Sequence, residues 1–321
     1  METVLESSRF SSLPTRVVVA IVAIPVIVAA AMLGSYYFFL LIALFSGFAL
    51  SEFYRLAEQK GAFPLKGLGL IAGFVVNGAF MYNRMQVEVF SYFESHGVRL
   101  SMFSQIQFLM VALLVFVLLV LLVELFRQKG SAILNASSTV FGVMIISLCF
   151  GTLIYTRELF PYGFPVSKFF PSSLADEAQL ATISRWGGYT VVSLFASIWV
   201  CDTAAYFGGL TFGRHRLFER VSPKKSWEGA VFGFFGALLT MIVARSVVLD
   251  YLRLQDAIII GGLIGIFGQL GDLIESRLKR DAGVKDSSAL IPGHGGVYDR
   301  FDSLVFVAPI VYLYIDFVVL S

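Results

Sequence analysis

The segment from Asp272 to Asp302 holds the residue types that could do chemistry, with six acidic and five basic side chains. If a helix continues past Gly271, four polar residues share one helix face, namely Asp272, Glu275, Ser276 and Lys279. Asp299 and Asp302, three residues apart, share a face at the start of the next apolar stretch. Clustered carboxylates repel each other unless a cation is present. Two helix ends therefore offer carboxylates for a hard cation such as Mg²⁺, which takes one or two of them together with substrate phosphates.

Basic residues and glycines surround these carboxylates. The basic residues, whose N–H groups suit phosphate oxygens, are Arg277, Lys279, Arg280, Lys285 and Arg300. Gly293, Gly295 and Gly296 flank His294, and glycines let backbone N–H groups approach a phosphate closely. The combination predicts phosphoryl or nucleotidyl transfer. A solvated loop that only sets orientation is the alternative, but such a loop should be mainly basic, whereas these charges nearly balance.

A second polar segment, 213–229, carries five basic residues against two acidic ones. Its sequence Ser222-Pro-Lys-Lys-Ser, with Lys224 and Lys225, could grip a phosphate. Binding of anionic lipid headgroups is the alternative interpretation. On the first interpretation, this segment supports phosphate chemistry at the same membrane face.

Asp202 lies inside an apolar stretch, where a carboxylate is costly and by default marks a functional site. A packing role beside Tyr206 or a nearby Ser or Thr is the alternative. Arg245 is a candidate partner for this carboxylate, unless its side chain reaches a membrane interface instead.

Familiar catalytic signatures are absent from the sequence, which has no G-x-x-x-x-G-K-[ST], no H-E-x-x-H and no G-x-S-x-G. The three histidines are His96, His215 and His294, too few and too scattered to favour a Ser-His-Asp hydrolase or a histidine-rich metal site. The two cysteines, Cys149 and Cys201, lie in apolar runs without metal or redox spacing, so we interpret both as packing residues.

The elements that must position these residues are membrane helices. Of the 321 residues, 57% are hydrophobic and 14% charged, against about 25% charged in soluble domains, and the mean hydropathy is +0.81. Spans of about 20 residues predict an all-α polytopic integral membrane protein with about nine transmembrane helices. The apolar stretches are 17–33, 36–51, 68–82, 105–123, 138–156, 188–208, 229–249, 256–271 and 303–320. We expect the stretches 68–82 and 256–271 to extend into flanking polar residues.

Three regions follow from these stretches: an N-terminal transmembrane region 1–104, a middle region 105–187 with an outer loop, and a C-terminal catalytic region 188–321. The N-terminus and even-numbered loops hold 17 Lys and Arg residues against 6 in the odd-numbered loops. This excess places the N-terminus and both polar segments in the cytoplasm and the C-terminus outside. Without the last two cytoplasmic loops the numbers are 7 and 6, which decide nothing alone.

Arg9 and Arg16 precede an apolar run with Ala29-Ala30-Ala31 near its end, a pattern similar to a cleavable signal peptide. A second apolar run begins directly after Gly34-Ser35, so we expect a helical hairpin instead. The outer loops 83–104 and 157–187 carry aromatic residues, which we interpret as interfacial anchors.

Small residues recur at helical spacing in the last third of the chain. They are Gly229, Gly233, Gly236, Gly261, Gly265, Gly268 and Gly271. Small faces let membrane helices approach closely. We therefore expect tight packing of the seventh and eighth stretches against each other, and one compact unit from the last four helices.

Three motifs in the last third of the chain carry a family resemblance. The longest runs from Ser276-Arg-Leu-Lys279-Arg280 through Lys285-Asp286 to Pro292-Gly-His294-Gly-Gly-Val-Tyr-Asp299-Arg300-Phe-Asp302. The others are Asp202-Thr-Ala-Ala-Tyr206 and Ser222-Pro-Lys-Lys-Ser-Trp-Glu-Gly229. Together they resemble the phosphatidate cytidylyltransferases, also called CDP-diacylglycerol synthases, with no departure at the charged positions of the longest motif. The detailed match covers about 188–302, and the first 187 residues match only as hydrophobic spans.

The resemblance implies a reaction of CTP with phosphatidate that gives CDP-diacylglycerol and pyrophosphate in membrane phospholipid biosynthesis. It implies Mg²⁺ with a second cation, a homodimer, and a site on the cytoplasmic side of a bacterial inner membrane. The expected metal ligands are Asp272, Asp299 and Asp302, and the expected catalytic residues are Asp272, Asp299, Lys279 and Lys285. The expected substrate-binding residues are Asp202, Ser222, Lys224, Lys225, Ser276, Arg280, His294 and Arg300. CTP, phosphatidate and membrane lipids are the expected partners, and no nucleic acid is expected.

The residues fit this chemistry, because a phosphatidate oxygen is already anionic at neutral pH and needs no strong general base. Two rival functions stay open. A membrane lipid kinase of the polyprenol or phytol type would use the same site but release a nucleoside diphosphate instead of pyrophosphate. A transporter would show broken helices in both halves of the chain, whereas polarity is concentrated in the last third.

Overall fold

The computed structural model describes residues 2–98, 104–170, 176–291, 293 and 295–321, and describes side chains from residue 17 onward. Most of this part is helical. The helices before the second half are α1 (Glu2–Leu33), α2 (Ser35–Gln59), α3 (Lys66–Ala79), α4 (Tyr82–Ser95), α5 (Gln105–Phe126), α6 (Ala132–Gly142), the π-helical turn η1 (Val143–Ser147) and α7 (Leu148–Gly163). The elements that follow are α8 (Val166–Phe169), α9 (Glu177–Phe212), β1 (Arg216–Phe218), β2 (Ser222–Ser226), α10 (Trp227–Val247), α11 (Leu254–Asp281), α12 (Tyr298–Tyr314) and η2 (Ile315–Val319).

Seven helices in the described part of the chain are long and apolar enough to cross a membrane. They are α2, α5, the continuous run α6–η1–α7, α9, α10, α11 and the run α12–η2. Two shorter apolar helices, Val17–Leu33 and Lys66–Ala79, coincide with the remaining apolar stretches of the sequence. The chain is thus a largely α-helical membrane protein, as expected. The number of nine crossings, the cytoplasmic N-terminus and the three regions remain predictions.

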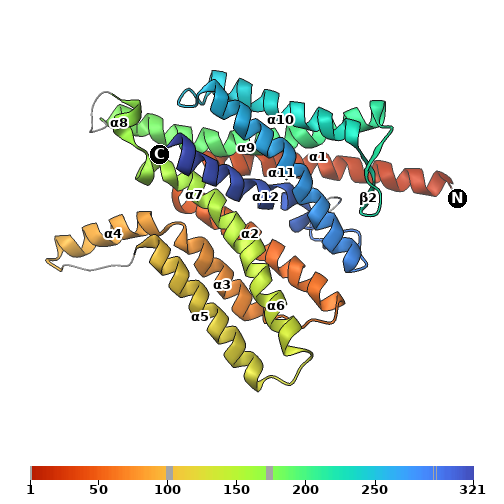
Figure 1. Cartoon of the computed structure of the whole chain (residues 1–321), viewed down its shortest axis with the longest axis horizontal. Coiled ribbons are helices and arrows are strands. Elements are labelled where there is room, and N and C mark those ends of the chain that lie inside the picture. Colours follow the sequence, from red (N-terminus) through yellow and green to blue (C-terminus); the bar gives the residue numbers. More distant parts are fainter. Residues whose placement is uncertain (1, 99–103, 171–175, 292, 294) are drawn as a thin grey trace.

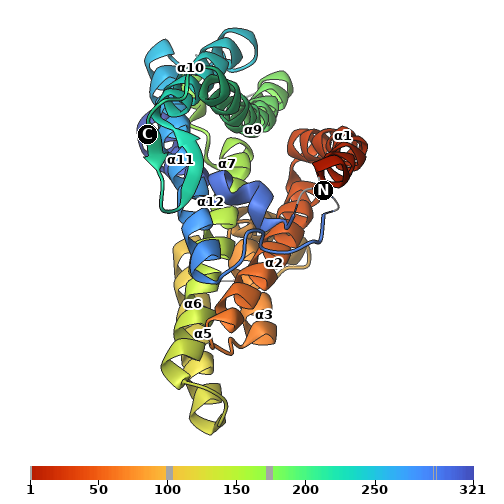
Figure 2. The ribbon, with the colours of Figure 1, turned by 90° about the vertical axis from the view of Figure 1, so that its right-hand side faces the viewer.

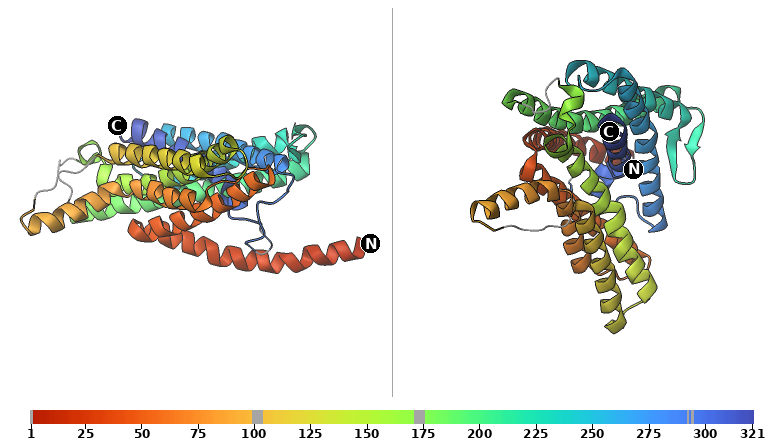
Figure 3. Two further views of the ribbon diagram at one scale, coloured as in Figure 1. Left: turned by 90° about the horizontal axis from the view of Figure 1, so that it is seen from below. Right: turned by 60° about the vertical axis from the view of Figure 1, so that its left-hand side comes forward.

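Two groups of helices lie side by side (Figure 1). Helices α9 to α12 pack against one another, while α2, α3, α5 and α6 form the second group with η1. Helix α7 joins the groups, because it contacts α9 and α12 as well as α2 and α3. Helix α1 lies along one side of the molecule (Figure 2; Figure 3, left) and contacts α9 and α2. The last four helices therefore form the compact unit that the sequence predicted.

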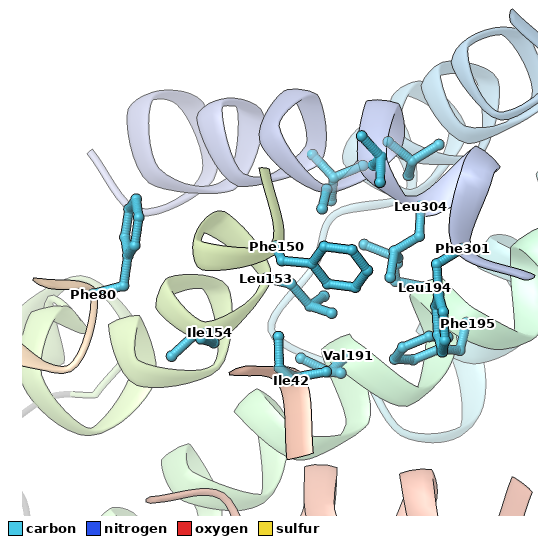
Figure 4. Packing of buried hydrophobic residues seen from close by; sticks show 14 of the residues in the cluster. Ile42, Phe80, Phe150, Leu153, Ile154, Val191, Leu194, Phe195, Phe301 and Leu304 are labelled. Atoms are coloured by element: carbon cyan, nitrogen blue, oxygen red, sulfur yellow. The ribbon is translucent and has the colours of Figure 1, made fainter. Parts of the chain in front are cut away.

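A cluster of aromatic rings holds the start of α12 against three other helices. The Phe301 ring centroid lies 4.8 Å from that of Phe45 in α2, 5.7 Å from Phe150 in α7 and 6.3 Å from Phe195 in α9. Figure 4 shows Phe150, Phe195 and Phe301 converging within the buried core. Tilted and edge-to-face ring pairs stabilise such contacts beyond area burial. Because Phe301 lies between Arg300 and Asp302 in sequence, this packing fixes where the polar residues of α12 sit.

The expected hairpin of the first two apolar stretches is present, and its turn is held by a buried arginine. Gly34 has a positive φ of 63° between α1 and α2. Arg157 Nε donates to the Ala31 carbonyl at 2.9 Å, and Arg157 Nη2 donates to the Met32 carbonyl at 3.3 Å. The sequence assigned Arg157 to an outer loop. That assignment is wrong, because this residue lies in α7 and is only 2% exposed.

A helix and a two-stranded hairpin lie in two segments where the sequence analysis expected loops. Helix α4, Tyr82–Ser95, occupies most of the described part of the segment 83–104. In the segment 213–229, strands β1 and β2 pair antiparallel, with Arg216 opposite Ser226. Helix α11 extends ten residues past the stretch 256–271, to Asp281, as expected. Helix α3 begins at Lys66, two residues before the stretch 68–82, as expected, but it ends at Ala79, before the end of that stretch.

The glycines of the last third pack helices closely, but not all in the expected pairs. A Cβ on Gly261 or Gly265 of α11 would lie 2.8 Å from Leu238 Cα or 2.9 Å from Phe234 Cα in α10. A Cβ on Gly229 or Gly233 of α10 would instead meet backbone oxygens of α9, at 2.7 and 2.9 Å. Close packing of α10 against α11 is thus confirmed, but only the α11 glycines contribute to this contact. The α10 glycines bring α10 to α9, which carries Asp202 toward the polar segments.

We predict that Gly261→Ala destabilises the fold, because the added methyl group would meet the α10 backbone. Overpacking of this kind costs about 1–3 kcal/mol. Gly262→Ala is the matched control, since its Cβ would lie 3.7 Å from the nearest atom of the Phe234 ring, an ordinary contact. The thermal midpoint in detergent should fall for Gly261→Ala and stay or rise for Gly262→Ala. Equal midpoints for the two variants would contradict this packing.

Candidate active site

A cavity of about 1110 Å³ opens between α1, α9, the β1–β2 hairpin and the adjoining ends of α11 and α12. Its acidic lining residues are Asp202, Asp272, Asp286, Asp299 and Asp302, and its basic ones are Arg216, Lys224, Lys225, Lys279 and Arg300. Apolar side chains also line it, from α1 (Val19, Ala20, Ala23, Ile24, Ile27) and from α9 (Trp199, Leu210). One space therefore joins both polar segments of the sequence to an apolar surface.

Asp272 is held by one neighbour from each polar segment. Lys225 Nζ lies 2.5 Å from Asp272 Oδ2, and Ser276 Oγ donates to Asp272 Oδ1 at 3.3 Å. Ser276 follows by four residues on α11, so the expected common helix face is confirmed here. Lys225, which precedes Asp272 by 47 residues in the sequence, compensates the charge of its carboxylate.

The β1–β2 hairpin brings Lys225 to that carboxylate. Strand β2 ends at Ser226, whose Oγ accepts from Gly229 N at 3.2 Å and caps the N-terminus of α10. Glu228 accepts from Arg214 N at 3.0 Å and pairs with His215 Nδ1 at 2.6 Å. These contacts tie both ends of the hairpin to the first turn of α10. Lys224 and Lys225 thereby face the cavity.

Lys279 is a buried cation between two carboxylates. Its Nζ lies 2.6 Å from Glu275 Oε2, one turn earlier on α11, and donates to Asp299 Oδ1 at 2.7 Å. The side chains of Glu275 and Asp299 are 1% and 3% exposed. Through these two contacts, Lys279 joins the end of α11 to the start of α12. Removing Lys279 would leave the charge of its buried partners uncompensated.

Asp299 also holds the loop that precedes α12. Its carboxylate accepts from Ser287 N at 2.9 Å, from Ser287 Oγ at 3.0 Å and from Gly296 N at 2.7 Å. Gly295 has a positive φ of 84°, and a Cβ there would lie 2.7 Å from Asp299 Oδ2. A Cβ on Gly296 would overlap Ser287 Oγ. These two glycines therefore let the loop backbone reach the carboxylate.

Asp302 and Asp202 complete the acidic lining near Asp272. A Cβ on Gly271 would lie 2.8 Å from the Asp302 carbonyl oxygen, so this glycine lets α12 approach α11 beside Asp272. Asp302 Oδ1 accepts from Ser303 N at 2.7 Å. Asp202, Asp272 and Asp302 lie close enough for their charges to interact, with Lys225 as a nearby cation. Like charges gathered in this way favour a bound cation.

The acidic residues form no preassembled metal cage within the part of the chain that is described, where no three His, Cys, Asp or Glu side chains are grouped closely enough. The donor chemistry nevertheless fits Mg²⁺, which needs one or two carboxylates beside phosphate oxygens. Two of the three expected ligands are now neutralised by lysines, Asp272 by Lys225 and Asp299 by Lys279. Each of those ammonium groups therefore already compensates the charge of one expected ligand.

Most of the expected site residues line the cavity, and a minority do not. Asp202, Lys224, Lys225, Asp272, Lys279, Asp299, Arg300 and Asp302 line it, and Ser276 contacts Asp272. Ser222, Arg280 and Lys285 are not among its lining residues; Arg280 Nη1 donates to the Val284 carbonyl at 3.0 Å, and Lys285 is exposed. His294 lies outside the described residues. Arg245 is not the partner of Asp202, since its Nε donates to the Leu252 carbonyl at 3.2 Å, beyond the far end of α10.

Sequence reasoning missed several polar residues of this site, of which Glu52 has the most contacts. Glu52 lies in α2, is 1% exposed, and accepts hydrogen bonds from the loop before α12. Asp286 and Arg216 also line the cavity. The signal for Glu52 was available, because an acidic residue in a span marks a functional site by default. The stretch 36–51 ended one residue too early for that rule to be applied.

Comparison with known proteins places the chain in a family. A family model described as "Cytidylyltransferase family" matches residues 14–318. This match spans nearly the whole chain, so the chain belongs to the cytidylyltransferase family. The resemblance seen in the motifs of the last third is confirmed and extends back to residue 14.

Individual relatives agree with this membership. The chain is 33% identical over 311 residues to the phosphatidate cytidylyltransferase of Synechocystis sp., a match covering 94% of this chain and 97% of that protein. It is 42% identical over 133 residues to the phosphatidate cytidylyltransferase of Thermotoga maritima, covering 40% of this chain and 49% of that protein. It is 35% identical over 204 residues to phosphatidate cytidylyltransferase 5, chloroplastic, of Arabidopsis thaliana, covering 61% and 49% of the two chains.

We predict that Lys279→Met lowers stability strongly, because it leaves Glu275 and Asp299 without their shared cation. Breaking a buried ion pair by removing one partner costs about 3–5 kcal/mol. Lys285→Met is the matched control, since Lys285 is exposed. Thermal unfolding in detergent without substrate should show a large drop for the first variant and little change for the second. A Lys279→Met midpoint equal to that of Lys285→Met would contradict the structural role of this lysine.

Proposed function

We propose that this chain transfers the cytidylyl group of CTP to phosphatidate, giving CDP-diacylglycerol and pyrophosphate in membrane phospholipid synthesis. Its membership of the cytidylyltransferase family supports this proposal, as do the names of its relatives. The observation that carries it is the composition of the cavity. A reaction between a water-soluble nucleotide and a membrane lipid needs charged groups for phosphates and an apolar surface for acyl chains in one space.

The cavity offers both environments. Arg216, Lys224, Lys225 and Arg300 supply positive charge for the phosphates of CTP and phosphatidate. Val19, Ala23 and Ile27 recur on one face of α1 and offer an apolar surface beside them. We propose that the lipid headgroup lies near Asp202, between these two environments. The acyl chains would then run along α1 and the facing side of α9.

The chemistry is a displacement at the α-phosphorus of CTP. An anionic oxygen of the phosphatidate phosphate forms a bond to that phosphorus, and the bond to the bridging oxygen breaks. Pyrophosphate leaves with the electron pair. No proton need be abstracted, so the absence of a catalytic histidine among the described lining residues is no obstacle. The task of the protein is to bring two anions together and to stabilise the leaving group.

We propose that Asp272, Asp299 and Asp302 hold Mg²⁺ against the CTP phosphates. When bound, Mg²⁺ would neutralise charge on the phosphate oxygens and on the leaving pyrophosphate. Lys225 and Lys279, released from their carboxylates, would then be available to phosphate oxygens. Ser222, Ser276, Arg280, Lys285 and His294 remain proposed phosphate-binding residues from the family motif. A second cation and a homodimer also remain proposals, as the family resemblance implies.

We propose that the site faces the cytoplasm of a cell whose inner membrane holds the chain. The cavity lies where α9 ends, α10 begins, α11 ends and α12 begins, and these ends share one side of the molecule (Figure 1). Lys and Arg gather at this side, which the positive-inside rule assigns to the cytoplasm. CTP is available there.

The direct test is turnover of radiolabelled CTP with phosphatidate in detergent, with separation of the products. We predict that the cytidine label enters the lipid fraction, that pyrophosphate is released, and that EDTA abolishes both. Release of CDP with a phosphorylated lipid would instead indicate a lipid kinase. No product with any lipid acceptor, from protein that is folded and supplied with Mg²⁺, would refute enzymatic phosphate transfer.

A second prediction concerns the carboxylate held by Lys225. Asp272→Asn should lower kcat on the order of 100-fold or more, the usual effect of losing a charge-stabilising group at a reacting centre. Asp281→Asn is the matched control on the same helix, since Asp281 is half exposed and pairs loosely with Lys60 at 3.6 Å. Turnover at saturating CTP and Mg²⁺ measures both. Wild-type turnover in Asp272→Asn would remove this residue from the proposed metal centre.

A further inference from the structure

Glu52 is a buried carboxylate that the proposed chemistry does not use. Its side chain, contributed by α2, accepts four hydrogen bonds from a segment more than 230 residues later. Oε1 accepts from Ser288 Oγ at 2.6 Å and from Val297 N at 3.1 Å. Oε2 accepts from Ser287 Oγ at 3.0 Å and from Tyr298 N at 2.7 Å. All four donors belong to the loop between α11 and α12 or to the first residue of α12.

These contacts place Glu52 at the N-terminus of α12. The first N–H groups of a helix have no partner within the helix. Val297, the residue before α12, offers no side-chain cap of its own. Glu52 accepts from Val297 N and Tyr298 N, so a distant carboxylate does the work of the cap. A negative charge at a helix N-terminus is also favourable electrostatically.

Glu52 and Asp299 hold the same loop from two sides. Ser287 Oγ lies 3.0 Å from Glu52 Oε2 and 3.0 Å from Asp299 Oδ2. Its hydroxyl proton can serve only one of these oxygens at a time. Gly296 packs so tightly against Ser287 and Glu52 that a Cβ there would overlap both Ser287 Oγ and Glu52 Oε2. The position of the loop, and of Asp299 behind it, therefore depends on Glu52.

We infer that Glu52 is a positioning residue that fixes the described ends of the loop before α12, at 287–288 and at 297, for reaction. It thereby also fixes the first turn of α12, with Asp299, Arg300 and Asp302. Glu52 itself is not among the cavity-lining residues. It acts through Ser287, Ser288 and the backbone of Val297 and Tyr298. A helix of the N-terminal group, α2, thereby positions the residues of the C-terminal group, α9 to α12. The part of this inference that is measured by turnover rests on the proposed function, whereas the part measured by hydrogen exchange does not.

Glu52→Gln is the sharpest test, because it preserves shape while replacing two acceptor lone pairs with an N–H₂ group. A serine hydroxyl can turn to accept from that group, but a backbone N–H cannot. We predict that hydrogen–deuterium exchange of peptides covering 287–301 becomes at least tenfold faster. A misplacement of about 1 Å can cost on the order of 100-fold in rate. We therefore expect kcat to fall by at least tenfold, with the phosphatidate KM within about twofold of wild type.

Glu58→Gln is the matched control on the same helix, since Glu58 pairs with Lys66 at 2.7 Å on the surface. It should leave exchange and turnover at wild-type values. Ser288→Ala is a milder variant that removes one hydrogen bond to Glu52, together with the bond that the Ser288 hydroxyl accepts from Leu290 N at 3.1 Å, and leaves the contacts of Asp299 intact. It should show the same pattern as Glu52→Gln with a smaller fall in kcat, and it keeps the test available if Glu52→Gln does not fold.

The outcomes separate this inference from the proposed function. Wild-type exchange over 287–301 in both Glu52→Gln and Ser288→Ala would overturn the inference, whatever reaction the protein catalyses. Faster exchange with unchanged kcat in an active enzyme would also overturn it. If Glu52→Gln frees the loop but the wild-type chain shows no cytidylyltransferase activity, the proposed function fails while the structural contact stands.

Discussion

Compensation of the charge of clustered carboxylates is the constraint on which the rest of this structure depends. Asp202, Asp272 and Asp302 lie within interaction range of one another, and Glu275 and Asp299 are buried nearby. Carboxylates in such a setting must find cations or hydrogen-bond donors. Lys225 and Lys279 supply the cations, and the loop before α12 supplies the donors. The carboxylates lie in α9, α11 and α12 and the lysines in β2 and α11, so the cluster dictates how these four elements meet.

The way the two groups of helices contact each other also depends on these buried charges. The glycines of α10 and α11 bring the C-terminal helices close enough for Lys225 and Asp272 to meet. Glu52 and Phe45, both in α2, reach across to the loop and to Phe301 at the start of α12. The N-terminal helices therefore do more than anchor the protein in lipid. They provide the buried carboxylate and the aromatic contact that set the position of α12.

The chemical residues were largely predictable from the sequence, but their partners were not. The face shared by Asp272, Ser276 and Lys279 follows from helical spacing, and the membership of the cytidylyltransferase family follows from the motif. The Lys225–Asp272 pair could not be predicted, because it depends on a hairpin in a segment that shows no strand alternation. Arg157 was misassigned, because a charge at the end of an apolar run reads as a loop residue when it is in fact buried against the α1–α2 turn. Glu52 was overlooked because the apolar stretch 36–51 was ended one residue too early, and its partners, more than 230 residues away, could not be predicted from sequence spacing.

The most direct test of the proposed metal site is anomalous diffraction at the manganese edge. The crystals would be grown with Mn²⁺ and a non-hydrolysable CTP analogue. If lysines hold the places of a divalent cation, a manganese peak should lie beside Asp272 and at least one of Asp299 and Asp302. The Lys225 ammonium should then have left Asp272 for a phosphate oxygen. A bound nucleotide with no manganese peak at these carboxylates would contradict the proposed metal site. A bound nucleotide with Lys225 still paired to Asp272 would contradict the proposal that this lysine is displaced by the cation.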